Sequence, residues 1–144
     1  MHKVVNGDSD MERFAREYSA SLASGDRATI LTLSGDLGSG KTSFARGILR
    51  AYGVIEVVTS PTFVIEKIYT PSHGAFKTIV HMDAYRLKNS KEAEALGFAE
   101  LVARPRTLIL IEWPEHIESA IPKGARKISF VIGEGAERTL LYDN

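Results

Sequence analysis

The stretch Gly35-Asp36-Leu37-Gly38-Ser39-Gly40-Lys41-Thr42 decides the fold of this chain. Its spacing is Gly-x-x-x-x-Gly-Lys-Ser/Thr, the pattern of a phosphate-binding loop, or P-loop. Glycines let such a backbone turn its N–H groups inward, and the helix that follows directs its positive end at the same point. The stretch therefore predicts a strand before it, a helix after it and a nucleotide phosphate held between them.

The flanking residues meet both requirements. Residues 28–33 are a short apolar, β-branched run typical of a buried strand. Residues 41–52 carry apolar side chains at helical spacing, and Gly53 ends the predicted helix. Upstream, Ser9-Asp10 has the composition of a helix cap, and a helix is predicted from there to a stop at Ser24-Gly25.

Further strands and helices alternate along the rest of the chain. Predicted strands cover residues 63–69, 76–82, 107–111, 127–132 and 139–142, and short helices cover 90–96 and 98–102. The first two and the last two of these strands are each joined by turn-forming residues and predict hairpins. We therefore expect an α/β fold, a P-loop NTPase-like three-layer sandwich with a mixed, largely parallel central sheet, over one domain of residues 1–144.

Composition sets further limits. The chain has 144 residues, no cysteine, and 18 basic against 18 acidic residues. Cysteine chemistry is thereby excluded, and zero net charge supplies no strong field for a polyanion such as RNA. The first residues lack the apolar stretch of a secretory signal, and no run approaches the roughly 20 apolar residues of a membrane span. We expect a cytoplasmic protein without membrane contact.

Residues outside the loop have to complete the site. Within it, Lys41 offers a positive charge to the β- and γ-phosphates, and the Thr42 hydroxyl can ligate Mg²⁺. An acid from a neighbouring strand is also needed, to hold the metal or to orient the attacking water. Asp83 and Glu112 each directly follow an apolar strand candidate, at the strand end where ligands bind in open α/β sheets. Spacing alone leaves open which acid has which role.

Three further segments follow the loop in a fixed order: Ser60-Pro61-Thr62-Phe63, His81-Met82-Asp83-Ala84-Tyr85-Arg86-Leu87 and Ile111-Glu112-Trp113-Pro114-Glu115. Together with the loop they resemble the TsaE family, small bacterial ATPases required for threonylcarbamoyladenosine formation on tRNA. The resemblance runs from about Ser9 to Pro122. Met82 and Ala84 depart from the usual Phe and Leu, and Phe63 from a frequent Tyr; these changes leave the chemistry intact.

The resemblance implies an activity and partners. TsaE proteins bind ATP and ADP with Mg²⁺ and hydrolyse ATP slowly. They associate with the TsaB–TsaD heterodimer, which transfers the threonylcarbamoyl group, and their ATPase supports cycling of that complex. A TsaB–TsaD-like pair is the implied partner here, with tRNA contacted only indirectly through the complex.

The resemblance also assigns roles to residues. The implied phosphate cradle consists of Gly38, Ser39, Gly40, Lys41, Thr42 and Ser43. Thr42 and Glu112 would ligate Mg²⁺. Asp83 would orient water or stand just outside the direct metal ligands, and it forms the implied catalytic set with Lys41 and Glu112.

Other assignments are less specific. Thr62 would sense the γ-phosphate and Trp113 would lie near the nucleotide, although a lone tryptophan is also a common core residue. The start of the first helix, near Asp10 and Met11, would approach the base. His81 lacks a second histidine or a cysteine at ligand spacing, so the sequence favours a structural role.

Two arginines, Arg86 and Arg138, also have two possible roles each. Arg86 could stabilise charge like an arginine finger, but the sequence favours pairing with an acid. The sequence favours a solvent-exposed side chain for Arg138, with contact to the nucleotide as the alternative.

Other functions can share the same loop. A small-molecule or nucleotide kinase is the main alternative, but the chain leaves little length for an acceptor pocket and an Arg-rich lid. A Ras-type GTP switch normally carries Asn-Lys-x-Asp, which is absent from the sequence. A nucleotide-dependent interaction module without turnover has the same residues as a slow ATPase.

Overall fold

Seven strands of the described chain form one sheet. The computed structural model describes residues 1–56, 58 and 65–143. The strands are β1 His2–Asn6, β2 Thr29–Ser34, β3 Glu66–Tyr69, β4 Thr78–Asp83, β5 Thr107–Glu112, β6 Arg126–Ile132 and β7 Glu137–Tyr142. The helices are α1 Asp8–Ser19, α2 Lys41–Ala51, α3 Ser90–Ala95 and α4 Phe98–Val102, with a 3₁₀ segment, η1, at Pro114–Ala120.

The sheet is mixed, as expected. Its strand order is β1-β7-β6-β2-β5-β4-β3. The four central strands, β6, β2, β5 and β4, pair in parallel, and the pairs at both edges are antiparallel. Because the central strands run the same way, the carboxyl ends of β2, β4 and β5 meet at one edge of the sheet.

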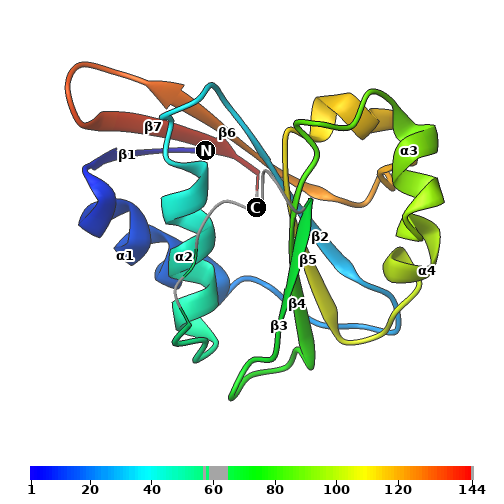
Figure 1. The fold of residues 1–144 in the computed structure, drawn as a ribbon. Coiled ribbons are helices and arrows are strands. Elements are labelled where there is room, and N and C mark those ends of the chain that lie inside the picture. The colour runs from blue at the N-terminus through cyan, green and yellow to red at the C-terminus, as the bar shows by residue number, and fades with distance from the viewer. Residues whose placement is uncertain (57, 59–64, 144) are drawn as a thin grey trace.

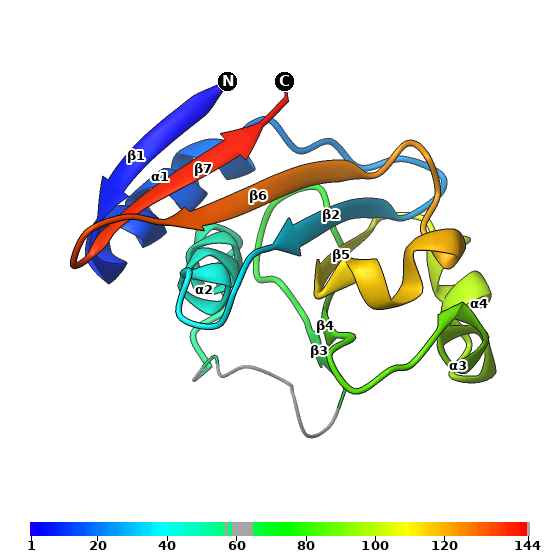
Figure 2. The ribbon, with the colours of Figure 1, turned by 90° about the horizontal axis from the view of Figure 1, so that it is seen from above.

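Helices cover both faces of the central strands. In Figures 1 and 2, α1 and α2 lie on one face, and α3, α4 and η1 lie on the other. Strand β5 is buried along its whole length. Its side chains alternate between two apolar clusters, with Leu108 and Leu110 on the α2 face and Ile109 and Ile111 on the other. The expected three-layer α/β arrangement is confirmed.

Helix α1 differs from its predicted bounds at both ends. Gly7, with φ 88°, is the N-cap residue, and the Asp10 carboxylate accepts a hydrogen bond of 2.9 Å from the Asn6 N–H. The α-helix ends at Ser19, and three successive hydrogen bonds of i to i−3 type carry the chain on to Leu22. This tighter turn still buries Leu22, so the apolar spacing predicted burial correctly and the helix end wrongly.

The hairpins form as predicted, but β1 had no counterpart in the sequence prediction. Strand β3 pairs antiparallel with β4, and β6 pairs antiparallel with β7 around residues 133–135. Residues 63 and 64 of the strand predicted over 63–69 lie outside the described residues. Strand β1 pairs with β7 at the sheet edge and buries only Val5, so its sequence lacks the alternation that marks a strand. No helix in the described part of the chain has the length and apolar character needed to cross a membrane.

Candidate nucleotide-binding site

The glycine-rich loop joins the end of β2 to the start of α2. Gly38 and Gly40 have φ of 80° and 101°, a left-handed conformation that other residues rarely adopt. Gly40 is the N-cap residue of α2, and among the described residues no side chain accepts a hydrogen bond from the first N–H groups of that helix. Those N–H groups are therefore available to an anion at the positive end of the helix.

The start of α1 lies against this loop. A Cβ added to Gly40 would stand 2.5 Å from the Met11 terminal methyl carbon. The Ser43 hydroxyl donates to Asp8 Oδ1 over 2.7 Å. Asp10, by contrast, binds the Asn6 N–H and Arg13. Of the two α1 residues expected to approach the base, Met11 thus contacts the loop, and Asp8 rather than Asp10 supplies the carboxylate beside it.

Lys41 is buried although it carries a charge. Only 5% of its surface is exposed, and its ammonium donates to the Gly35 carbonyl. Nζ also lies 4.0 Å from the centroid of the Trp113 ring. Burial lowers the pKa of Lys41, and nearby carboxylates, with Glu112 the most effective, partly oppose this shift. Among the described residues no acid forms an ion pair with this ammonium, and a phosphate would supply a counter-charge in direct contact.

The two predicted acids are cross-strand partners. Asp83, the last residue of β4, stands in register with Glu112, the last residue of β5, and both side chains are buried. Glu112 Oε2 lies 3.5 Å from Thr42 Oγ1, at the long limit of a hydrogen bond, and 2.6 Å from His81 Nε2. Asp83 Oδ1 accepts from the Tyr85 N–H at 2.9 Å.

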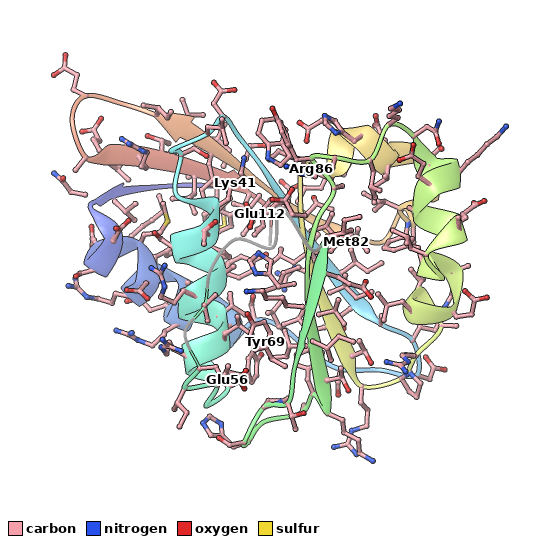
Figure 3. The ribbon with its side chains drawn as sticks, in the orientation of Figure 1. Lys41, Glu56, Tyr69, Met82, Arg86 and Glu112 are labelled. Carbon is pink, nitrogen blue, oxygen red and sulfur yellow. The ribbon has the colours of Figure 1, made fainter. Side chains whose placement is uncertain are left out.

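These groups line one cleft of about 550 Å³ at the carboxyl edge of the parallel strands. Figure 3 shows Lys41, Glu112 and Arg86 gathered at this end of the molecule, with Tyr69 and Glu56 toward the other. The lining residues are Asp8, Leu37, Gly38, Ser39, Gly40, Lys41, Thr42, Ser43, Asp83, Tyr85, Arg86, Glu112 and Trp113. They include Trp113 and every residue of the predicted phosphate cradle, metal-binding set and catalytic set, but not Asp10 or Met11. Thr62 lies outside the described residues.

The donor set fits Mg²⁺ bound together with a phosphate. Thr42 and Glu112 present a hydroxyl and a carboxylate oxygen, the hard ligands that Mg²⁺ prefers. No cluster of three or more His, Cys, Asp or Glu side chains suited to a metal occurs in the described part of the chain. A site with few protein ligands is typical of Mg²⁺ that takes its remaining ligands from water and substrate phosphates.

Trp113 packs against the core and also lines the cleft. It is half-buried and packs against the apolar cluster on the face of the sheet opposite α2. Its ring centroid lies 5.1 Å from that of Tyr85 and 5.9 Å from that of His116. Its ring lies against Lys41 at the cleft, so packing in the core does not exclude a contact with a ligand there.

Sequence reasoning missed several contacts of the site. His81, expected to be structural, bonds Glu112, and the alternation of a strand could have revealed this because residues 81 and 83 share one face. Arg138 Nε donates to the Gly38 carbonyl over 3.1 Å. That contact and the one between Asp8 and Ser43 join residues far apart in sequence. No local sequence pattern predicts such contacts.

A glycine-rich strand–loop–helix with acids at the adjacent strand ends is the arrangement of P-loop NTPase-like α/β proteins. The chain belongs to the TsaE family: the family model described as Threonylcarbamoyl adenosine biosynthesis protein TsaE matches residues 5–140.

Individual relatives agree with this membership. The chain is 36% identical over 140 residues to the tRNA threonylcarbamoyladenosine biosynthesis protein TsaE of Rickettsia typhi, which covers 96% of this chain and 90% of the relative. It is 37% identical over 120 residues to the protein of the same name from Rickettsia bellii, with 83% and 78% covered. The crystal structure of Bacillus subtilis YdiB superposes with a TM-score of 0.78 at 27% identity, covering 99% of this chain and 83% of YdiB.

Proposed function

We propose that this chain binds Mg·ATP and Mg·ADP in the cleft and hydrolyses ATP slowly, as a cytoplasmic accessory protein of tRNA threonylcarbamoyladenosine biosynthesis. The observation that carries the proposal is the convergence of Lys41, Thr42 and Glu112 on one cleft at the start of α2. Family membership supports the pathway and favours this function over a kinase with the same loop.

The chain's own groups suit phosphate binding. The uncapped N–H groups at the start of α2 and the left-handed glycines form a cradle for phosphate oxygens. Lys41 would leave the Gly35 carbonyl or the Trp113 ring to meet the phosphates. Thr42 and Glu112 would hold Mg²⁺, which when bound neutralises charge on the phosphate oxygens.

The geometry supports different roles for the two acids. Glu112 suits metal binding because its carboxylate stands next to the Thr42 hydroxyl. Asp83 suits orientation of the attacking water, since it lines the same cleft at the end of the neighbouring strand. The Tyr85 N–H holds one of its oxygens and so limits rotation of the carboxylate.

We extend the proposal to a partner, a TsaB–TsaD-like heterodimer that performs the group transfer. The support is family membership, together with a net charge of zero, which leaves the binding of tRNA to the partner proteins.

Two experiments test the proposal. Calorimetry with Mg·ATP and Mg·ADP should show binding by the wild-type chain and much weaker binding by Lys41→Ala. A pull-down with and without nucleotide should recover a TsaB–TsaD-like pair in an ATP-dependent manner. No heat of association with either nucleotide would refute the nucleotide site, whereas nucleotide binding without partner recovery would refute only the partner.

A further inference from the structure

A histidine lies buried directly beneath the proposed metal ligand. His81, in the middle of β4, has no exposed surface, and its Nε2 stands 2.6 Å from Glu112 Oε2. Its other ring nitrogen, Nδ1, is buried and has no hydrogen-bond partner among the described residues. The ring therefore has one polar contact in the described structure, and that contact is to Glu112.

Strand register explains why the contact forms. Asp83 pairs with Glu112 across β4 and β5, and His81 pairs with Leu110. Residues two apart on a strand share a face, so His81 lies one step back from the strand ends, on the face that carries both acids. Its ring reaches Glu112 from the core side, while Thr42 approaches the same carboxylate oxygen from α2.

Packing alone does not account for a histidine at this position. Ile79, Leu108 and Leu110, on the same face of β4 and β5, all belong to the apolar cluster beneath α2. An apolar side chain of similar size would fill the space without burying an unpaired ring nitrogen, which costs stability. What an apolar side chain cannot supply is a hydrogen bond to the carboxylate.

We propose that His81 is a positioning residue: its Nε2–H donates to Glu112 and holds the carboxylate against Thr42, ready for the divalent cation. The inference rests on the proposed function. Outer groups that orient a metal ligand typically change metal affinity or activity by 10- to 100-fold when removed.

Three substitutions separate positioning from packing. His81→Leu keeps an apolar volume and removes the donor. His81→Gln can place an amide N–H near the position of Nε2, whereas the shorter His81→Asn places one near Nδ1. The measurements are calorimetric ADP binding without Mg²⁺, the Mg²⁺ concentration that gives half of the Mg²⁺-dependent gain in ADP affinity, and thermal unfolding of each variant.

We expect His81→Leu to raise the half-saturating Mg²⁺ concentration by about 10- to 100-fold. Affinity for ADP without Mg²⁺ should stay at the wild-type value. His81→Gln should recover most of the loss and His81→Asn little of it. In a Glu112→Ala background, His81→Leu should add no further Mg²⁺ defect, because the group that it positions is absent.

Contrary results are distinguishable. An unchanged Mg²⁺ requirement in His81→Leu would overturn the role of His81 and leave the proposed function intact. The role of His81 would also be overturned if His81→Gln and His81→Asn required the same Mg²⁺ concentration. It would be overturned as well if ADP binding without Mg²⁺ and thermal stability fell together in every variant, as a packing role requires. A wild-type chain whose ADP binding does not respond to Mg²⁺ would overturn the proposed metal site and this inference together.

Discussion

The Lys41 ammonium lies over the indole ring of Trp113, 4.0 Å from its centroid, while it donates to the Gly35 carbonyl. A cation over a tryptophan face is a favourable contact, worth roughly 0.5 to 2 kcal/mol depending on exposure. Trp113 directly follows Glu112, so this contact joins the phosphate-binding end of the site to its metal-binding end. Any movement of Lys41 toward a phosphate therefore alters the surroundings of the indole.

We expect Mg·ADP to change the fluorescence of Trp113, because a phosphate draws Lys41 away from the ring. The chain has one tryptophan, so the emission reports this site alone. Lys41→Ala should weaken binding by about 10- to 100-fold, as loss of a charged hydrogen bond worth about 1.5 to 3 kcal/mol predicts. Lys91→Ala, an exposed lysine on α3, is the matched control, and equal weakening by both variants would contradict the assignment.

Glu112→Gln should remove the charge of the proposed metal ligand while keeping its shape. Mg²⁺-dependent ATP turnover is expected to fall by roughly 100-fold or more, the usual cost of losing a group that stabilises charge in the transition state. A phosphate-release assay at several Mg²⁺ concentrations measures this. Glu94→Gln on α3, where the side chain is exposed, is the control. Turnover at the wild-type rate in Glu112→Gln would exclude Glu112 from the site.

The free energy of unfolding should depend on the protonation of Lys41 at alkaline pH. Burial lowers the pKa of Lys41 below its ordinary value of 10.5, so the folded state binds fewer protons than the unfolded state between these two values. In that window the free energy of unfolding of the wild type should rise with pH relative to Lys41→Met. Below the lowered pKa, the difference between the two proteins should be constant.

Urea unfolding of both proteins from neutral pH to 10.5 tests this sign. Lys91→Met, in which an exposed lysine is lost, should show no such trend relative to the wild type. A wild type that loses stability relative to Lys41→Met over the window would mean that Lys41 is charged more readily in the folded state, contrary to its burial.

Gly47→Ala should destabilise the fold although alanine favours helices. An added Cβ would stand 2.5 Å from Ala15 Cβ and 2.7 Å from the Glu12 carbonyl oxygen, so α1 and α2 would have to separate. Overpacking of this kind costs typically 1 to 3 kcal/mol, more than the about 1 kcal/mol that alanine gains over glycine in a helix. Urea unfolding measures the difference. Gly25→Ala is the control, since its Cβ would meet nothing within 4 Å; a more stable Gly47→Ala would show that the helices yield freely.

Local patterns predicted most of the secondary structure and the centre of the site. The glycine spacing from Gly35 to Thr42 implied the strand before it and the helix after it. The position of Asp83 and Glu112 directly after apolar runs predicted that each acid lies at the strand end where ligands bind, and the structure adds that the two are cross-strand partners. The failures concern places with little local pattern: the edge strand β1, which buries a single side chain, and the end of α1, where a tighter turn replaces the helix.

Sequence alone therefore determined the chemical groups of this protein and the elements that carry them: the loop, Lys41, Thr42 and the two acids. Tertiary structure alone decided which distant groups hold these in place, as in the contacts of His81 with Glu112 and of Arg138 with Gly38. Such contacts span 31 and 100 residues of chain. They depend on strand order and register, which arise from the packing of the whole sheet. Neither of the two segments in contact has a sequence periodicity that predicts them.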